Sequence, residues 1–334
     1  GLEVWLGDAS MPAGESDETI APSAGAPPAA TDPAAAVLGP AHPGGLAGAG
    51  EGAAPGQAPP TDAEGAPGHH LADEAMLARL RDEFYENSEY QSLGYWRRGT
   101  KSQKEACDIL MEKLYAGIRN KSGTILDVAC GRGATTRWLA GRYPAAAITG
   151  IDTLDDNVDA ARRNAPGARI LKMEPTALEF PDASFDNVLC VQAAFHFNTR
   201  ADFLKEALRV LKPGGRLVLS DVLTPRRIEE QYRRRMGKNY LRDPEAYRKL
   251  LRETGFADTK AVDATSPVWE GFCMNVARFA TKKLLEGEIE FPLFKMALGR
   301  LVLGFPVVDF YLLIWAQKGS ADAVPTTPGT VQGL

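Results

Sequence analysis

The chain has 334 residues and a formal net charge of −5 at pH 7, and this charge is unevenly distributed. Residues 1–70 hold nine acidic residues and no Lys or Arg, so residues 71–334 carry 38 basic and 34 acidic side chains, a net charge of +4. So small a surplus excludes a dedicated nucleic-acid binder, which presents a strongly basic surface.

The sequence also argues against membrane and secreted proteins. The longest candidate apolar run, residues 307–316, is too short for a membrane span and contains Asp309. Residues 1–20 lack the basic and apolar regions of a secretory signal peptide. The four cysteines are far apart and form no Cys-x-x-Cys pair, so we expect neither disulfides nor a zinc site. This cysteine usage suits a reducing cytoplasm.

Composition divides the chain into three parts. Ala, Pro and Gly occupy 36 of the 50 positions in residues 21–70, which leaves too little large apolar surface to offset the entropy of ordering. We therefore predict a disordered linker over residues 1–70, one α/β domain over residues 71–319 and a second linker over residues 320–334. Linkers at both ends suggest a piece of a longer polypeptide, although trimming explains the missing initiator Met equally well.

The predicted domain begins with helical pattern and continues with alternating strands and helices. A capping box, Ser102 to Glu105, marks a helix start. Short β-branched runs then predict strands at 124–129, 147–152, 168–173, 186–192 and 216–222. A helix at 201–211 should stop at the Lys-Pro-Gly-Gly breaker of residues 212–215. This alternation is typical of a parallel sheet covered on both faces, and the run 307–316 predicts a final, antiparallel strand.

The most informative segment joins the first strand to a helix through the turn Gly131-Arg132-Gly133. Glycines let the backbone approach a ligand closely, and a helix start offers N–H groups to an anion. Asp152 ends the next strand, 21 residues after Gly131, where a carboxylate can accept both hydroxyls of a ribose. A strand-to-helix turn that merely needs glycine remains the plain alternative.

Two features distinguish the candidate nucleotides. The dinucleotide-binding fingerprint requires a small residue where this chain has Thr136. Asp127, four residues before Gly131, would repel a pyrophosphate but suits a ligand with sulfonium and ammonium groups. The pattern therefore favours S-adenosylmethionine (SAM) over a nicotinamide cofactor.

Four ordered motifs now carry a resemblance to a known family. They are residues 126–133 (LDVACGRG), 150–152 (GID), 178–186 (LEFPDASFD) and 206–215 (EALRVLKPGG). Residues 90–222 resemble a class I SAM-dependent small-molecule methyltransferase, and the chain is similar to the O-methyltransferase domains of modular polyketide synthases. The resemblance implies a Rossmann-like, doubly wound, seven-stranded sheet whose last strand is antiparallel, with a helical lid insertion.

The resemblance also implies a set of cofactor-binding residues. Those expected to contact SAM are Asp127, Ala129, Gly131 and Gly133 at the methionine part, Asp152 at the ribose, Thr153, Leu154 and Glu174 at the adenine, Gln192 at the amino group, and Tyr95 in an N-terminal flap. The chain departs from the family at Pro175, which lacks the N–H that would donate to the adenine ring.

His196 is the candidate general base, because the other three histidines lie in the leader or at its edge. It follows the carboxyl end of the fourth strand, where ligands bind in open α/β sheets. An imidazole is well matched to accepting a proton from an alcohol at neutral pH. Asp221 is the first candidate to orient it and Glu270 the second, whereas a core histidine and a capping Asp221 are the plain alternatives.

The remaining site features are less specific. One histidine and no cluster of metal-binding side chains predict a reaction without a metal. Between the last strands, residues 268–303 predict helices with an apolar stripe, which either packs on the core or forms a lid and pocket wall. That wall would include Phe272, Met274 and Phe294. Arginines 226, 227 and 233–235 form a basic run, either a solvated helix face or a contact for a carrier phosphate.

The sequence thus predicts a SAM-dependent O-methyltransferase acting on a hydroxyl of a polyketide-type acyl chain, with an acyl carrier protein as the leading partner. A free-standing natural-product O-methyltransferase is the close alternative. A C-methyltransferase, a SAM-fold cyclase and a non-catalytic carrier-docking scaffold stay open.

Overall fold

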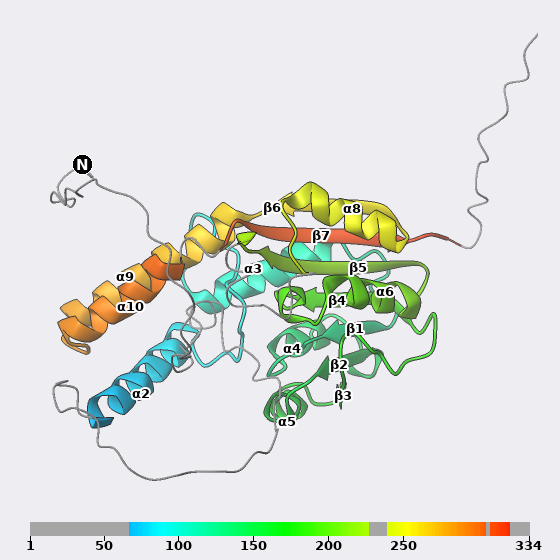
Figure 1. Cartoon of the computed structure of the whole chain (residues 1–334). Coiled ribbons are helices and arrows are strands. Elements are labelled where there is room, and N and C mark those ends of the chain that lie inside the picture. Colours follow the sequence, from blue (N-terminus) through cyan, green and yellow to red (C-terminus); the bar gives the residue numbers. More distant parts are fainter. Residues whose placement is uncertain (1–66, 227–238, 305–307, 321–334) are drawn as a thin grey trace, which may run out of the picture. The chain divides into compact units, whose positions relative to one another are not determined.

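One mixed sheet of seven strands organises the described residues, which in this computed structural model are 67–226, 239–304 and 308–320 (Figure 1). The strands are β1 (Ile125–Val128), β2 (Ile148–Asp152), β3 (Arg169–Lys172), β4 (Phe185–Val191), β5 (Leu211–Leu223), β6 (Phe256–Asp263) and β7 (Phe310–Lys318). Their order is β3-β2-β1-β4-β5-β7-β6, with β7 antiparallel to both of its neighbours. The predicted Rossmann-like fold with an antiparallel last strand is confirmed.

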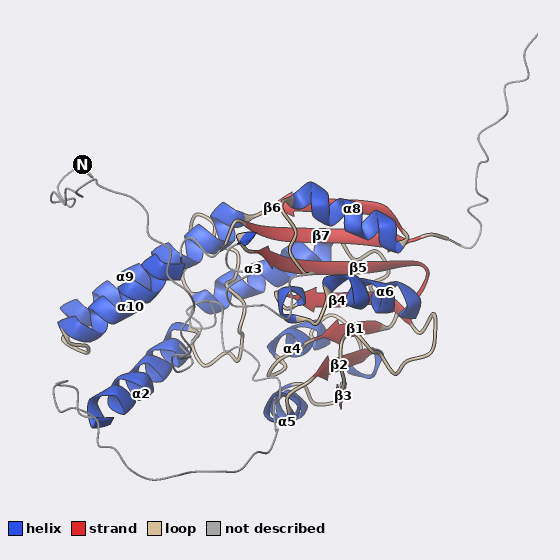
Figure 2. Cartoon of the chain, in the orientation of Figure 1, coloured by secondary structure: helices blue, strands red, loops and turns tan. Residues whose placement is uncertain are grey.

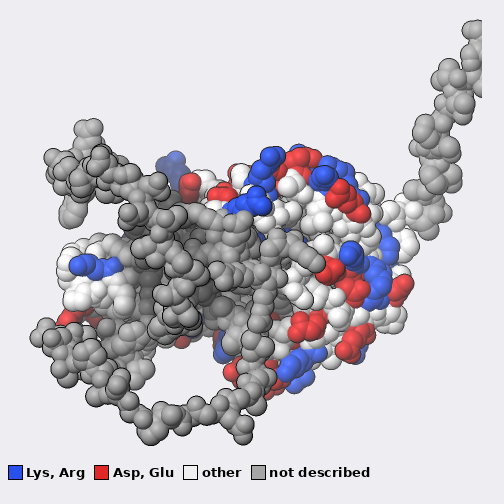
Figure 3. Space-filling model, in the orientation of Figure 1, with Lys and Arg blue, Asp and Glu red and all other residues white. Residues whose placement is uncertain are grey.

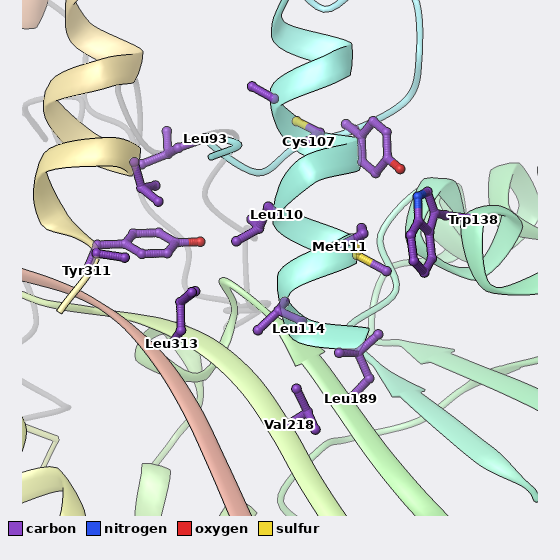
Figure 4. Close-up of a cluster of buried hydrophobic side chains, with 14 of the residues drawn as sticks. Leu93, Cys107, Leu110, Met111, Leu114, Trp138, Leu189, Val218, Tyr311 and Leu313 are labelled. Atoms are coloured by element: carbon purple, nitrogen blue, oxygen red, sulfur yellow. The ribbon is translucent and has the colours of Figure 1, made fainter. Parts of the chain in front are cut away.

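Helices cover both faces of this sheet, because the strands bury side chains on each side (Figure 2). The helices on one face are α3 (Gln103–Ala116), α4 (Ala134–Ala140) and α5 (Asp155–Asn164), and those on the other are α6 (Arg200–Val210) and α8 (Pro244–Thr254). Short 3₁₀ turns lie at η1 (Ala145–Ala147) and η2 (Ala194–His196). Figure 4 shows Leu110 and Leu114 of α3 above Leu189 and Val218 of the sheet.

The predicted capping box opens α3, with one difference in detail. The Ser102 hydroxyl accepts the Glu105 N–H at 3.2 Å, as expected. The Glu105 carboxylate accepts the N–H of Lys101 at 2.8 Å rather than that of Ser102. Two donors at the helix start are still satisfied, so the motif fixes where α3 begins.

The predicted break at residues 212–215 is wrong in one respect, since β5 begins at Leu211, directly after α6. Leu211 pairs with Phe185, and the register then shifts before Asn187 pairs with Arg216. Gly214 supplies the left-handed backbone of this irregularity, with φ +76°. The helix therefore ends as predicted, but the glycines lie within the following strand instead of separating the helix from it.

A helical insertion connects β6 to β7 at the carboxyl edge of the sheet (Figure 1). It comprises the π-helical turn η3 (Ser266–Glu270), α9 (Gly271–Leu285) and α10 (Phe291–Gly304), which confirms predicted helices in this region. Helix α2 (Pro67–Phe84) packs against them, and it begins inside the stretch predicted to be linker. The buried Lys283 ammonium pairs with Glu83 of α2 and, at 2.8 Å, with Glu288.

The apolar stripe predicted in this insertion faces inward. Phe279 and Leu284 pack in the small cluster formed by α2, α9 and α10, and Ala280 is buried. Phe272 is buried against Trp269, whereas Met274 is 54% exposed and lies on the outer face of α9. The structure therefore removes Met274 from the inner wall that the sequence predicted.

Basic and acidic side chains are interspersed on the face of the described residues that Figure 3 shows. Apart from Arg226, the arginine run predicted as a basic patch lies outside the described residues. Within the described parts of the chain, no helix combines the length and the apolarity that crossing a bilayer requires.

Candidate active site

The loop from β1 to α4 is held in an unusual backbone conformation. Ala129, Gly131 and Gly133 all have positive φ angles of 55°, 55° and 88°. A Cβ on Gly133 would lie 2.7 Å from Cα of Ala161, so glycine allows α5 to pack closely against this loop. A left-handed conformation at a non-glycine residue such as Ala129 destabilises the fold. Such strained residues are common in ligand-binding loops.

Asp127 lies beneath this loop and is 1% exposed. Its Oδ2 accepts the hydroxyls of Thr135 and Thr136, each at 2.7 Å, so the carboxylate secures the start of α4. Burial raises the pKa of Asp127 to about 6, against the opposing effect of the two hydroxyls. The described contacts of this residue are thus structural, and its predicted contact with SAM stays a prediction.

Asp152 ends β2 beside the glycine loop, as the sequence predicted. Its Oδ1 accepts the N–H of Leu154 at 3.1 Å and the amide of Asn157 at 3.0 Å. Its Oδ2 accepts the Gly131 N–H at 2.9 Å. A carboxylate oxygen has two lone-pair sites, so Oδ2 retains capacity for a further donor such as a ribose hydroxyl.

The segment 86–96, which we call the flap, crosses the glycine loop. Glu89 pairs with Arg132 of that loop, and the hydrogen bond from Arg132 lowers the pKa of Glu89. A Cβ on Gly131 would lie 2.7 Å from Oε1 of Gln91, so the missing side chain allows Gln91 of the flap to approach the loop closely. The Leu93 N–H donates to Oε1 of Gln192 at 3.0 Å, which ties the flap to β4.

A cleft lies between the flap and the carboxyl ends of the strands. Five of the predicted residues line it: Ala129, Gly131, Asp152, Gln192 and His196. The lining does not include the other predicted cofactor residues, which are Asp127, Gly133, Thr153, Leu154, Glu174 and Tyr95. The Tyr95 ring instead lies 4.4 Å from the Lys113 ammonium.

Sequence reasoning missed three residues that line the cleft at the glycine loop and the flap, namely Glu89, Gln91 and Arg132. Arg132 stands inside the Gly-x-Gly motif, so its position was available from the sequence. Glu89 and Gln91 belong to the flap, and only the fold brings them against a loop some 40 residues later.

His196 closes the cleft on the side of β4. It ends the turn η2, is half-buried and contributes to the lining of the cleft. Its backbone N–H donates to Ala193 at 2.9 Å. Among the lining residues, it carries the one side chain whose ordinary pKa lies near neutrality, so it is the best-matched proton acceptor there.

The structure gives Asp221 a different environment from the one predicted. Its carboxylate pairs with Arg200 at 2.6 Å and accepts the Tyr247 hydroxyl at 2.9 Å and the Phe195 N–H at 3.0 Å. These contacts reach the backbone next to His196 and not its imidazole. Glu270, the second candidate, is exposed and accepts the Ser266 hydroxyl at 2.7 Å.

The cleft residues fit SAM. The cleft runs along the backbone of Gly131, and Asp152 presents an acceptor at the end of β2. Acidic and polar lining at Asp152 and Gln192 suits a ligand with ribose hydroxyls and a positive charge.

Comparisons with known proteins agree with this geometry. Residues 126–219 match a family model described as a methyltransferase domain. The chain is 30% identical to O-methyltransferase cnsE of Penicillium expansum, over 62% of this chain and 79% of that protein. It is 31% identical to 27-O-demethylrifamycin SV methyltransferase of Amycolatopsis mediterranei, over 53% and 71%. It is 32% identical to erythromycin 3''-O-methyltransferase of Saccharopolyspora erythraea, over 54% and 66%.

Solved structures show the same fold. The [4+2]-cyclase SpnF matches with a TM-score of 0.56 and 21% identity, covering 75% of this chain and 94% of that one. Phosphoethanolamine N-methyltransferase 2 of Haemonchus contortus, in complex with S-adenosyl-L-methionine, matches with a TM-score of 0.57 and 16% identity, covering 73% and 57%. The glycine loop and Asp152 agree with the family model and with two relatives that match over most of their length. The chain therefore belongs to the class I SAM-dependent methyltransferases of small molecules, and SAM is its cofactor.

Proposed function

We propose that the protein is an O-methyltransferase that methylates a hydroxyl of a polyketide-type product, with His196 as general base. The observation that carries the proposal is the position of His196 in the wall of the cleft that the glycine loop and Asp152 also line. The names of the relatives that act on oxygen support the same chemistry.

The other charged side chains that line the cleft already have partners within the protein. Glu89 is neutralised by Arg132, and Asp152 accepts three hydrogen bonds from its own neighbourhood. Both carboxylates are therefore already held by donors from the flap, the glycine loop and α5 rather than left open toward an acceptor hydroxyl. An imidazole is then the lining group that best combines position and basicity.

The reaction needs little covalent chemistry from the protein. When bound, SAM supplies an electrophilic methyl group on sulfur. In the proposed step, His196 takes the hydroxyl proton as the oxygen bonds to the methyl carbon, the carbon–sulfur bond breaks, and S-adenosylhomocysteine leaves. The cleft walls align the two reactants, and such alignment supplies much of the acceleration.

The proposed acceptor class is supported by the relatives that are named for erythromycin and 27-O-demethylrifamycin SV. Tethering to an acyl carrier protein is the finer form of the proposal, supported by the linker-like composition on both sides of residues 71–319. We propose these bounds for the catalytic domain. Free and carrier-bound acceptors carry the same reacting hydroxyl, so an experiment must distinguish between them.

The full chain is incubated with deuteromethyl SAM and a panel of macrolides, ansamycins and β-hydroxyacyl carrier proteins, each with its hydroxyl free or blocked. Mass spectrometry and NMR then locate the new methyl group. Methylation of oxygen only in free-hydroxyl substrates supports the proposal, and transfer to carbon overturns it. Turnover of the carrier-bound form alone would establish the tethered substrate.

His196→Asn tests the base. We expect kcat to fall by about 100- to 10,000-fold, while calorimetric SAM affinity stays within about twofold, because the amide keeps polarity but cannot accept the proton. Asp159→Asn serves as a control, since Asp159 pairs with Arg162 in an exposed ion pair and lies outside the cleft lining. Turnover of His196→Asn at the rate of the control would remove His196 from the mechanism.

A further inference from the structure

A buried polar network lies behind the turn that carries His196. Its four members are Arg200, Asp221, Asn239 and Tyr247, with exposed fractions of 2%, 0%, 1% and 0%. They come from α6, β5, the approach to α8 and α8 itself, so the network joins four separate parts of the fold.

Asp221 holds the residue before His196. Its Oδ1 accepts the Phe195 N–H at 3.0 Å and the Val222 N–H at 2.9 Å. Its Oδ2 accepts the Arg200 Nε–H at 2.6 Å and the Tyr247 hydroxyl at 2.9 Å. All the acceptor capacity of this carboxylate is therefore directed at the turn and at its supports.

Asn239 holds the residue after His196. Its side-chain Nδ2 donates to the Phe197 carbonyl at 3.1 Å, and its Oδ1 accepts the Arg200 N–H at 2.5 Å. The Arg200 guanidinium returns to the Asn239 carbonyl at 2.5 Å. The backbone is thus fixed on both sides of His196, by Asp221 on one side and by Asn239 on the other.

Stability alone does not account for such an arrangement. Burying an ion pair costs desolvation that its attraction barely offsets, and apolar replacements of buried pairs are often neutral or stabilising. What a fully satisfied buried network supplies is a unique local geometry. Here the geometry that it fixes is the position of one half-buried imidazole at the cleft wall.

We propose that Asp221 and Asn239 are positioning residues for methyl transfer, which hold the 195–197 backbone so that the His196 imidazole meets the acceptor hydroxyl. This inference rests on the proposed role of His196 as base. It replaces the direct Asp221–imidazole contact that the sequence suggested with a contact through the backbone.

Asn239→Ala tests the proposal with the smallest disturbance, because it leaves the Arg200–Asp221 pair in place. Asn187→Ala is the matched control. Asn187 is also 1% exposed and also donates to a backbone carbonyl, that of Asn120 at 2.8 Å, but it lies in β4 away from the cleft lining.

Three measurements are compared in the full chain. We expect Asn239→Ala to lower kcat by about 10- to 100-fold, as small misplacements of a catalytic group do, with SAM affinity within twofold. Amide hydrogen exchange at residues 195–197, followed by NMR without any acceptor, should accelerate at least about tenfold. In the His196→Asn background, Asn239→Ala should cause no further loss of kcat, because residues that act as a unit are not additive. Asn187→Ala should change none of the three by more than about threefold.

If Asn239→Ala melts far below Asn187→Ala, Asn239→Asp replaces it, since the carboxylate still accepts the Arg200 N–H but cannot donate to Phe197. Unchanged kcat and unchanged exchange in the folded Asn239 variant overturn the inference, while an inactive His196→Asn leaves the proposed function standing. An additive loss in the double variant also overturns it. An active His196→Asn instead refutes the base itself.

Discussion

Two buried carboxylates, Asp127 on β1 and Asp221 on β5, lie on either side of β4, and their surroundings differ. Asp127, under the glycine loop, meets only the hydroxyls of Thr135 and Thr136. Asp221, behind His196, meets a guanidinium and three further donors. On the cofactor side, Asp127 is therefore held by local hydroxyl groups, whereas on the acceptor side Asp221 depends on a compensated charge that joins distant segments. A local change should affect ligand affinity on the first side and the placement of the base on the second.

Asp152→Ala is the largest test of the cofactor side. It removes the acceptor that the ribose hydroxyls require, and each hydrogen bond to a charged group contributes about 1.5–3 kcal/mol. We expect SAM affinity, measured by calorimetry, to fall at least about 100-fold. Asp155→Ala, in an exposed pair with Lys172, should leave that affinity unchanged. An Asp152→Ala affinity within threefold of wild type would place the ribose elsewhere.

Asp127→Asn tests the buried carboxylate of the cofactor side through the pH dependence of stability. The pKa of Asp127 is raised to about 6 in the folded chain, against about 4 for a carboxyl in the unfolded chain. The buried group is therefore neutral, and destabilises the fold least, at pH values below about 4. Stability falls as pH rises through about 6, by on the order of 2–3 kcal/mol at about 1.4 kcal/mol per pKa unit. The neutral amide should flatten this fall and make the protein more stable at pH 7.

Urea unfolding at several pH values between 4.5 and 7.5 measures this difference. Asp159→Asn, which breaks the exposed pair of Asp159 with Arg162, is the reference variant. If Asp127→Asn and wild type lose stability in parallel over this pH range, the buried carboxyl does not titrate as the structure indicates.

Glu89→Gln should have the smallest effect. The Glu89–Arg132 pair joins flap to glycine loop, but its side chains are 31% and 39% exposed, and exposed pairs contribute only about 0.2–1 kcal/mol. We expect SAM to dissociate about two- to fivefold faster at low salt, with the difference lost near 1 M salt, where screening acts over about 3 Å. Stopped-flow release measures it, and a difference that persists at high salt would argue against an electrostatic latch.

The sheet could be predicted from the sequence because each strand is a short buried run between clear helical patterns. The glycine loop and Asp152 could be predicted because the relevant residues lie close together in the chain. The flap contacts of Glu89 and Gln91 could not, since a polar segment of positive φ carries no periodic pattern.

The role of Asp221 shows the same limit on the acceptor side. Its place at the end of a strand was predictable, and this correctly brought it near His196. Its partner was not, because Arg200 reads in sequence as an ordinary first residue of a helix, and only the pairing of β4 with β5 buries it beside the carboxylate.

The attachment of the insertion between β6 and β7 has a consequence for how such enzymes diversify. Asp263 ends β6 opposite Leu312 near the start of β7, so η3, α9 and α10 leave and re-enter the sheet at adjacent points. An insertion attached at a single strand pair can be exchanged without altering the register of β6 and β7. Evolution, or an engineer, can therefore vary that whole insertion while the machinery for the methyl donor is inherited intact.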